Sequence, residues 1–289
     1  MIYICVLNYN NAQDTIVCLE SLKKLNNIKY KVILVDNGSP DDSVDILKKY
    51  KNDNVHCIFS KKNLGYAAGN NLAIRYAMNQ DNMEYCWIIN NDTVVHEDSL
   101  YYLKKYMDAN PGVGLCGSKL VYEWDRTRLQ GYGGIYNPYL GITRMCTSTK
   151  DIKKINFVCG AACLVSRAFL EEVGLMTEDY FLYYEEIDWA CRAKGKFSLG
   201  CVPESIVYHK EGATIGGGAQ NVNDKSELSD YYSIRNRILI TKRYYTKFLP
   251  IVYLGLLITI INRIRRKQYS RIFMILKLMC GWRDNTYEK

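Results

Sequence analysis

The first 110 residues alternate short apolar segments with segments of helical periodicity, and this alternation constrains the fold most strongly. The apolar segments have the length of β-strands and comprise residues 3–7, 32–35, 55–59 and 85–89. Apolar residues recur every three or four positions in residues 12–25, 67–79 and 97–109, which predicts helices there. A further helix is expected to begin at Ser39-Pro40, a typical N-cap and first-turn pair. Strands joined by helices are parallel, so we expect an α/β fold with a mostly parallel, Rossmann-like sheet flanked by helices.

Short polar side chains follow each of the four predicted strands. They are Asn8, Asp36, residues 61–63 and residues 90–92. In sheets of this class ligands bind at the carboxyl ends of the strands. Asn, Asp and Gly are also ordinary turn residues, so each position alone has a structural explanation. Four such positions in register nevertheless favour a binding site at this edge.

The second half of the chain is less regular. Residues 113–165 contain short apolar segments separated by Gly-rich turns. Residues 181–192, FLYYEEIDWACR, place three acids at the predicted start of a helix. A strand is expected at 197–202, after which Val207 leads to His209. A loop is expected at 212–218 and helix from about Glu227 onward.

Composition and charge exclude several classes of protein. With 289 residues, 48% apolar and 24% charged, the chain is globular and long enough for one large α/β domain with a helical appendage. Residues 235–289 contain 13 Lys or Arg and 2 Asp or Glu, a net charge of +11, which leaves 25 bases and 28 acids in residues 1–234. The basic character therefore belongs to the C-terminal tail, and without a recognisable reading motif we expect no nucleic-acid partner.

The 11 cysteines are scattered, with no Cys-x-x-Cys pair, and most lie in apolar segments. A free thiol in such a segment behaves as a small hydrophobic side chain. Together with the absence of a signal-peptide pattern at the start, this favours a reduced, cytosolic chain without zinc.

Seven motifs in order resemble glycosyltransferase family 2, inverting enzymes with the GT-A fold, and in particular its rhamnosyltransferase-like members. The motifs are LNYNN (7–11), VDNGS (35–39), NLGYAAGNN (63–71), INNDT (89–93), FVCGAACLVSR (157–167), YFLYYEEIDWACR (180–192) and VPESIVYHKEG (202–212). The resemblance implies a GT-A catalytic domain over residues 1–235. Residues 1–110 would form its nucleotide-binding half, residues 111–235 its acceptor-binding half, and residues 236–289 a basic amphipathic helical tail.

The resemblance also implies residues for donor binding. Asp36 corresponds to the family's Asp that bonds the base or ribose, and Asn8 would line the same pocket. Asn63 and Gly69 would let the backbone approach the diphosphate and donor sugar, although helix packing explains Gly69 nearly as well. The alternative for Asp36 is a structural role as a turn-forming residue before Asn37-Gly38.

A metal site is implied at residues 90–92 and at His209. The family carries Asp-x-Asp here, whereas this chain has Asn90 at the first position, so Asp92 is the expected carboxylate ligand of Mg²⁺ or Mn²⁺. His209 matches the family's second metal-site residue, and its alternative is a structural histidine. Asn90 and Asn91 are assigned to the donor diphosphate, with a turn as the alternative for Asn91.

Glu186 is the expected catalytic base. In the family's E-D-x-D element the second acid has this role, and Glu186 occupies its position in Glu185-Glu186-Ile187-Asp188. Aromatic neighbours could raise the pKa of the carboxyl group toward the working range of a base. The alternative is that these acids stabilise a helix N-terminus, with Asp188 paired to Arg192 four residues later.

The tail combines apolar and basic segments. Residues 248–261, FLPIVYLGLLITII, fall short of the roughly 20 residues that span a bilayer. Arg263, Arg265, Arg266 and Lys267 follow, then a second apolar stretch at 272–279. This pattern favours a helical hairpin in the interface of anionic membranes. A helical cap or a homodimer interface is the alternative.

We therefore expect an inverting, metal-dependent glycosyltransferase on the cytoplasmic face of the cell membrane. It would move rhamnose or a hexose from a dTDP- or UDP-sugar to a polysaccharide or lipid-linked saccharide. The alternatives are a sugar nucleotidyltransferase, for which the loop after the first strand lacks the expected Gly and Lys, and a carbohydrate-binding or scaffold protein, against which the acids at 185–188 argue.

Overall fold

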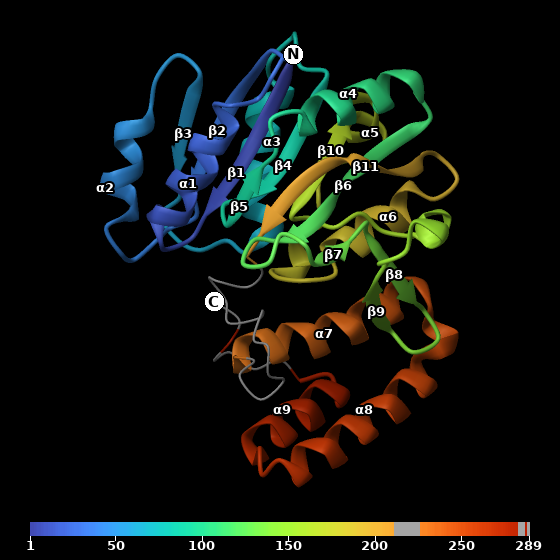
Figure 1. Cartoon of the computed structure of the whole chain (residues 1–289). Helices are drawn as coiled ribbons and strands as arrows, with labels where there is room; N and C mark the ends of the chain where they lie inside the picture. Colours follow the sequence, from blue (N-terminus) through green and yellow to red (C-terminus); the bar gives the residue numbers. More distant parts are fainter. Residues whose placement is uncertain (211–225, 283–286, 288–289) are drawn as a thin grey trace.

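The structure, a computed structural model, describes residues 1–210, 226–282 and 287. A central mixed sheet carries helices on both faces, and three C-terminal helices lie below the sheet (Figure 1). The predicted loop at 212–218 lies outside the described residues.

The first half of the sheet is parallel, as the alternating pattern predicted. Its strands, in spatial order, are β3 (Val55–Phe59), β2 (Tyr30–Asp36), β1 (Ile2–Asn8) and β4 (Tyr85–Asn90). The connecting helices are α1 (Ala12–Leu22), α2 (Ser43–Leu47) and α3 (Tyr66–Met78), and α4 (Ser99–Ala109) follows β4. The α/β fold class is therefore confirmed.

The second half adds strands of mixed direction beyond β4, in the order β10, β6, β11 and β5. β10 is antiparallel to both neighbours, and β5 is antiparallel to β11. These strands are β5 (Thr93–Val95), β6 (Val113–Tyr122), β10 (Ala162–Ser166) and β11 (Ser198–His209). A short strand, β7 (Leu129–Gly131), pairs with β6. Strands β8 (Gly134–Asn137) and β9 (Ile142–Met145) form a separate pair. The strand predicted at 197–202 extends to His209 as β11, with a register shift between Val202 and Ile206.

Two apolar layers form because successive side chains of a strand point to opposite faces. On one face Ile2, Ile4 and Val6 pack with α1, α2 and α4. On the other face Tyr3 and Cys5 pack with α3, α5 (Arg167–Glu172) and α6 (Glu185–Ala193). Each fully buried Ile, Leu or Val stabilises this arrangement by about 1.5–3 kcal/mol.

Local signals misplaced one helix start. The helix predicted at Ser39-Pro40 begins at Ser43 instead, because the Ser39 hydroxyl donates to Asp36 Oδ1 at 2.6 Å and so holds a turn. The helix predicted within residues 181–192 begins at Glu185 and has the three acids in its first turn, as expected. Phe181, Tyr183 and Tyr184, which precede it, have positive φ. The short 3₁₀ helices are η1 (Lys48–Tyr50), η2 (Thr149–Lys154), η3 (Glu178–Tyr180) and η4 (Thr246–Phe248).

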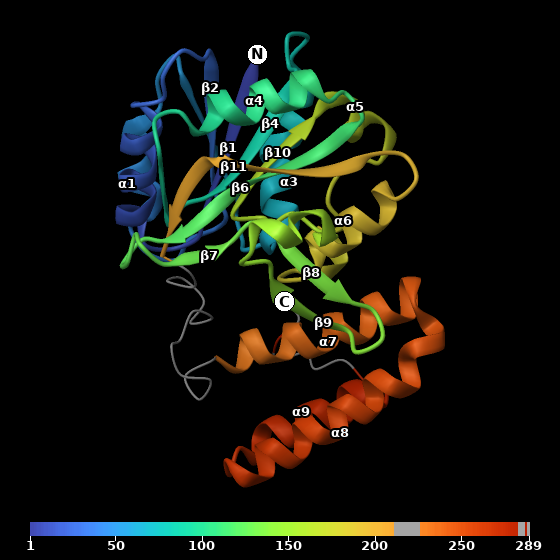
Figure 2. The ribbon, with the colours of Figure 1, turned by 45° about the vertical axis from the view of Figure 1, so that its right-hand side comes forward.

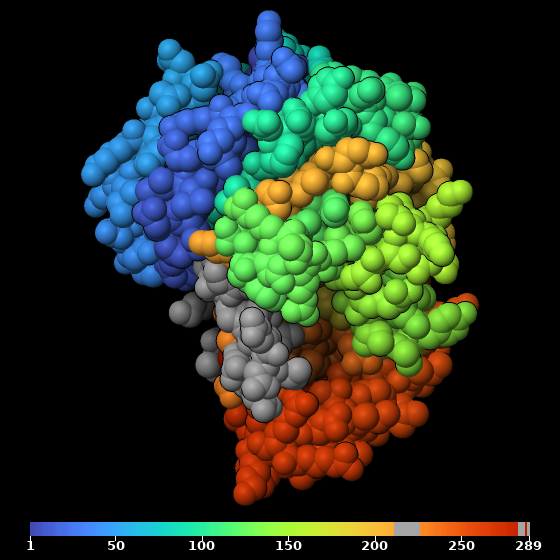
Figure 3. Space-filling model, viewed as in Figure 1, coloured from blue at the N-terminus to red at the C-terminus, as the bar shows by residue number. Residues whose placement is uncertain are grey.

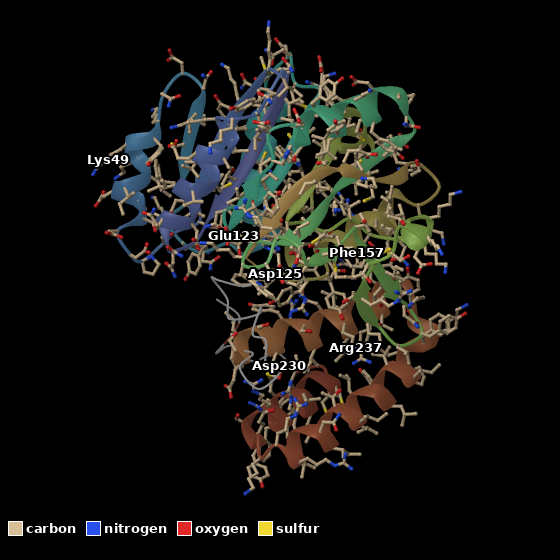
Figure 4. All side chains as sticks on the ribbon, viewed as in Figure 1. Lys49, Glu123, Asp125, Phe157, Asp230 and Arg237 are labelled. Atoms are coloured by element: carbon tan, nitrogen blue, oxygen red, sulfur yellow. The ribbon has the colours of Figure 1, made fainter. Side chains whose placement is uncertain are left out.

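The tail is helical, as expected. It consists of α7 (Glu227–Tyr244), α8 (Leu249–Arg265) and α9 (Tyr269–Met279). Figure 2 shows α7 lying between the sheet and the α8–α9 hairpin. On α7, Asp230 forms buried ion pairs with Arg263 at 2.7 Å and Arg271 at 3.2 Å, while Arg237 donates to Leu140 O at 3.0 Å (Figure 4). Helix α7 therefore contacts the hairpin through Asp230 and the β8–β9 connection through Arg237.

Candidate active site

Asp36 and Asn8 lie at the ends of β2 and β1, where the parallel register places them side by side. Both are fully buried, and Asn8 Nδ2 donates to Asp36 Oδ1 at 2.8 Å. Ser39 donates to the same carboxylate through its hydroxyl at 2.6 Å and its backbone N–H at 3.0 Å. A carboxylate has about four acceptor sites, so about one stays available for a ligand. Asp36 thus shapes the turn and can still accept a hydrogen bond.

Asn91 extends this network into the protein interior. Its Nδ2 lies 3.0 Å from Thr15 Oγ1 and 3.3 Å from Asn8 Oδ1, and Thr15 donates to the same Asn8 oxygen at 2.6 Å. The side chain of Asn91 therefore supports Asn8. The neighbouring Asn90 is half-buried, and its carbonyl accepts from Thr93 Oγ1 at 2.7 Å, which turns the chain from β4 into β5.

Asn63 and Gly69 lie at the start of α3. Asn63 Oδ1 accepts from Asn37 Nδ2 at 3.0 Å and from Gly65 N at 2.9 Å, so it fixes the loop before the helix. A Cβ on Gly69 would come within 2.6 Å of Leu7 Cδ1. Gly69 thus lets α3 pack closely against the Leu7 side chain of β1.

Asp92 and His209 meet although 116 residues separate them in the sequence. β5 pairs with β11, which places Thr93 opposite His209 and Asp92 beside it. His209 Nε2 lies 3.2 Å from Asp92 Oδ1, and both side chains are buried. His209 Nδ1 lies 3.1 Å from Gln130 Oε1. With the proton on Nδ1 donated to Gln130, Nε2 presents a lone pair to the carboxylate.

This pair fits a divalent cation. Within the described residues, Asp92 Oδ1 and His209 Nε2 are buried without a hydrogen-bond partner. Two facing lone pairs repel unless a cation or a proton lies between them. Adjacent ligands of an octahedral ion, each about 2.1 Å from it, are about 3.0 Å apart, close to the separation here. A histidine whose other nitrogen donates to an oxygen is also the usual arrangement of a metal ligand.

The described residues contain no group of three or more His, Cys, Asp or Glu side chains that could hold a metal. The remaining ligands would therefore come from water and from the bound substrate. Next to the pair, Lys210 donates its backbone N–H to Asp92 O at 3.1 Å and its ammonium to Asp14 Oδ1 at 2.6 Å. The hydrogen bond to Asp14 raises the pKa of Lys210, which keeps a positive charge beside Asp92.

Glu186 lies in the first turn of α6. Its Oε1 accepts from the backbone N–H of Gly160 at 3.2 Å, and Tyr66 donates its hydroxyl to the carbonyl of the same glycine at 2.8 Å. A Cβ on Gly160 would lie only 2.7 Å from both Glu186 Oε1 and the Tyr66 hydroxyl. Burial raises the pKa of Glu186, which brings a carboxyl group toward the range of an effective base.

The neighbouring acids differ from Glu186. Glu185 is 2% exposed, and burial, followed by the charge of Glu186, raises its pKa well above the usual value. Burial also opposes ionisation of Asp188, but hydrogen bonds from Thr177, Tyr244 and Arg192 hold its pKa below the usual range. The predicted pairing of Asp188 with Arg192 is present at 2.9 Å. Asp188 is therefore a structural centre that fixes α6.

Sequence reasoning missed several residues that shape these sites. Gly160 and Tyr66 each lie within a quoted motif, yet nothing local links them to Glu186. Gln130 belongs to the irregular second half and to no motif, and its contact with His209 arises because β7 pairs with β6.

Comparison with known proteins agrees with this description. Residues 3–174, more than half of the chain, match the family described as glycosyl transferase family 2. The chain is 23% identical over 252 residues to the low-salt glycan biosynthesis hexosyltransferase Agl10 of Haloferax volcanii, covering 84% of this chain and 76% of that protein. It is 24% identical over 254 residues to the dTDP-rhamnosyl transferase RfbF of Shigella flexneri, covering 86% and 82%.

Two solved structures share the fold. The mannosyltransferase PcManGT from Pyrobaculum calidifontis, in complex with GDP-Man and Mn²⁺, has a TM-score of 0.58 at 13% identity, covering 96% of this chain and 84% of that one. Residues 1–349 of S. aureus TarS give a TM-score of 0.56 at 15% identity, covering 88% and 71%. These structures confirm the GT-A fold. The family match identifies an enzyme that transfers a sugar rather than a nucleotide. The chain belongs to glycosyl transferase family 2.

Proposed function

We propose that this glycosyltransferase is inverting and metal-dependent, and that it moves rhamnose or a hexose from a dTDP- or UDP-sugar to a polysaccharide or lipid-linked saccharide. The observation that carries the proposal is the facing pair of Asp92 and His209 near the carboxyl edge that holds Asp36 and Asn8. The names of the two relatives, a hexosyltransferase and a dTDP-rhamnosyl transferase, support the choice of donors.

In this proposal each group has one task. Asp36 and Asn8 bind the nucleoside, while Asn63, Gly69, Asn90 and Asn91 shape the pocket for the diphosphate and donor sugar. Asp92 and His209 hold Mg²⁺ or Mn²⁺, which neutralises the charge that develops on the leaving diphosphate. Glu186 accepts the proton of the acceptor hydroxyl, whose oxygen then attacks the anomeric carbon from the side opposite the diphosphate. Direct displacement inverts that centre.

The raised pKa of Glu186 suits this task. A base is most effective when its pKa lies near the working pH, and it contributes typically 10²–10⁴-fold to the rate. The backbone N–H of Gly160 holds Oε1 in one position, so the carboxylate does not have to be ordered during the reaction.

We also propose that the tail contacts the inner face of the cell membrane, with the chain otherwise in the cytoplasm. The helical stretch Thr246–Arg265 is longer than the apolar segment 248–261 that the sequence indicated, so by length and composition it could cross a membrane. Only 22% of its most apolar 18-residue window is buried. Its outward side chains include Leu254, 60% exposed, and Ile258, 57% exposed, and Phe273 on α9 is 67% exposed. In Figure 3 the surface of α8 and α9 forms the lower end of the molecule. Homodimerisation is the other way to cover this face.

Residues 1–110, 111–235 and 236–289 correspond in this proposal to the nucleotide-binding half, the acceptor-binding half and the tail. Helix α7 runs through the last of these boundaries, so the tail begins inside a helix that also packs on the catalytic part.

A nucleotide-sugar panel tests the function. UDP-glucose, UDP-N-acetylglucosamine, GDP-mannose and dTDP-rhamnose are each mixed with the protein and Mn²⁺, and the melting temperature is measured. The release of nucleoside diphosphate is measured in the same mixtures, where water takes the place of the acceptor hydroxyl and is deprotonated by the same base. We expect one donor to raise the melting temperature only with the metal present. Glu186→Gln should keep that shift but release diphosphate about 10²–10⁴-fold more slowly. Release at the wild-type rate by this variant would remove Glu186 as the base.

A further inference from the structure

The segment that leads into the proposed base has an unfavourable backbone conformation. Between η3 and α6, Phe181, Tyr183 and Tyr184 have φ of 61°, 67° and 73°. None of them is Gly, and bulky side chains rarely adopt positive φ. Such conformations persist only when the surrounding structure holds them in place. Tyr184 is the residue before α6, so this segment sets where α6 begins and where Glu186 lies.

One buried side chain binds the segment from α7. Asn236 is fully buried, and its Nδ2 lies 2.8 Å from Tyr180 O, 2.7 Å from Leu182 O and 3.0 Å from Tyr183 O. Its Oδ1 accepts from Arg235 Nη1 at 2.7 Å. Because Arg235 can only donate, this contact fixes the amide with its N–H groups toward the segment.

Further contacts show that α7 braces both ends of the segment. Before it, Arg243 Nη2 lies 2.7 Å from Asp179 Oδ2. After it, Arg243 Nη1 and the Tyr244 hydroxyl lie 3.1 Å and 2.8 Å from Asp188 Oδ1. These charged contacts explain why α7 is docked here. They do not explain why the Asn236 amide donates to three backbone carbonyls. Those hydrogen bonds act only on the conformation of the segment.

The opposite side of the segment is held by α3. Tyr66 N donates to Phe181 O at 2.6 Å, and a Cβ on Gly65 would lie 2.5 Å from the same oxygen. Tyr66 is also the residue whose hydroxyl binds Gly160, the contact of Glu186. The segment is therefore held between two helices, and one of these helices reaches the site of the base directly.

We propose that Asn236 is a positioning residue for the transfer reaction. Its amide holds residues 180–183 in the conformation that presents Glu186 to the acceptor, so α7 is part of the catalytic machinery and not only the start of a membrane-binding tail. This inference rests on the proposed role of Glu186 as base. It assigns a catalytic consequence to a residue that touches neither donor nor acceptor.

The first test needs no substrate. Asn236→Asp keeps the shape and the acceptor for Arg235 but replaces the donating amide with a carboxylate facing three carbonyls. Thr241→Val is the matched control, because Thr241 is fully buried on the same helix and its hydroxyl donates to Arg237 O at 2.7 Å. Hydrogen–deuterium exchange of residues 180–188 should be about tenfold faster in Asn236→Asp, the effect of losing one buried hydrogen bond, and unchanged in the control. Wild-type protection of this segment in Asn236→Asp would overturn the proposal.

The second test separates positioning from stability. Release of nucleoside diphosphate is measured with the most active of the four nucleotide sugars named above. In Asn236→Asp we expect kcat to fall about a hundredfold, since a misplacement of about 1 Å has this effect, with KM for the donor within about twofold of wild type. Asn236→Ala, which removes the donors without adding charge, replaces the Asp variant if that variant does not fold.

The outcomes distinguish this proposal from the proposed function. If Glu186→Gln releases diphosphate at the wild-type rate, the assignment of the base is wrong. If Glu186→Gln is inactive while Asn236→Asp keeps the wild-type kcat and pH profile despite faster exchange, only the positioning role is wrong. Faster exchange together with a lower kcat and an unchanged KM supports the proposal.

Discussion

Asp92 Oδ1 and His209 Nε2 face each other at 3.2 Å in the protein interior, and among the described residues neither atom has a hydrogen-bond partner. Two unpaired acceptors in contact are unfavourable unless a positive charge lies between them. A proton on Nε2 or a divalent cation supplies such a charge, and the metal site proposed above is the second of these alternatives.

Removing the carboxylate should abolish metal-dependent donor binding. With Asp92→Asn we expect Mn²⁺ plus UDP to leave the melting temperature unchanged. In the wild type the same ligands, at a hundredfold excess over Kd, should increase the free energy of unfolding by about 2.7 kcal/mol and so raise the melting temperature. Asp53→Asn is the control, because Asp53 is exposed on a loop. An equal Mn²⁺-dependent shift in wild type and Asp92→Asn would show that the metal, if bound, lies elsewhere.

Gly160→Ala should reduce catalysis more than stability. The new methyl group would lie 2.7 Å from Glu186 Oε1 and the Tyr66 hydroxyl, so both side-chain ends must move. We expect diphosphate release to fall about a hundredfold. Gly112→Ala is the matched control, because a Cβ there meets nothing within 4 Å. If both variants release diphosphate at the same rate, the contact between Gly160 and Glu186 does not matter for the reaction.

Glu185→Gln should stabilise the protein at neutral and higher pH. Burial, and then the charge of Glu186, raise the pKa of Glu185 well above its usual value of 4.5. At pH values between the usual pKa, which holds in the unfolded state, and the raised pKa of the folded state, the folded state binds more protons than the unfolded state. The free energy of unfolding therefore decreases as pH rises through this range. The variant does not titrate here, so its advantage in Tm should be larger at pH 8 than at pH 5.

Differential scanning fluorimetry across this pH range measures the effect. We expect a gain of about 2–4 °C at pH 8, the shift that corresponds to about 1 kcal/mol in a domain of this size. Glu97→Gln, at an exposed position, should change Tm equally at both pH values. A gain for Glu185→Gln that grows as the pH is lowered would contradict the sign of this argument.

The double substitution Leu254→Glu and Ile258→Glu should detach the protein from membranes. Both side chains are more than half exposed on α8, and inserting such side chains into a bilayer contributes about 1.5–3 kcal/mol each. We expect co-sedimentation with vesicles of phosphatidylglycerol and phosphatidylcholine to fall at least about tenfold. Val17→Glu is the control, because Val17 is an apolar residue on α1 that is 38% exposed and lies outside the tail, and it should have no effect.

Sedimentation without lipid distinguishes membrane binding from homodimerisation. If the wild type does not bind vesicles but sediments as a dimer that the α8 double substitution dissociates, a second copy of the chain covers this face. The membrane proposal then fails, while the α8–α9 surface remains an interface.

Local sequence determined the first half of the fold. Four apolar segments separated by helical periodicity leave a parallel sheet as the arrangement that buries both faces, and the polar residues after each strand must then share one edge. Motif order identified the family, and the spacing of Asp188 and Arg192 predicted their ion pair, because four residues span one helical turn.

Where a local preference competed with a longer-range contact, the local preference failed. Ser39 is a good N-cap, but its hydroxyl binds Asp36, so α2 begins at Ser43. Asn236 and Tyr66 hold the aromatic residues before Glu185 in positive-φ conformations. No property of residues 181–184 alone indicates this, because the partners lie on helices distant in sequence.

The tertiary structure alone decided which functional residues meet. Asp92 reaches His209 because β5 pairs antiparallel with β11, and Gln130 reaches His209 because β7 pairs with β6. Glu186 reaches Gly160, and Asn236 reaches the segment before Glu186, only through the packing of α6 and α7. The sequence determined which residue types stand at the strand ends and helix starts. Non-local pairing determined their partners, because hydrogen bonds between distant segments depend on strand order and helix docking, which leave no periodic signal in the chain.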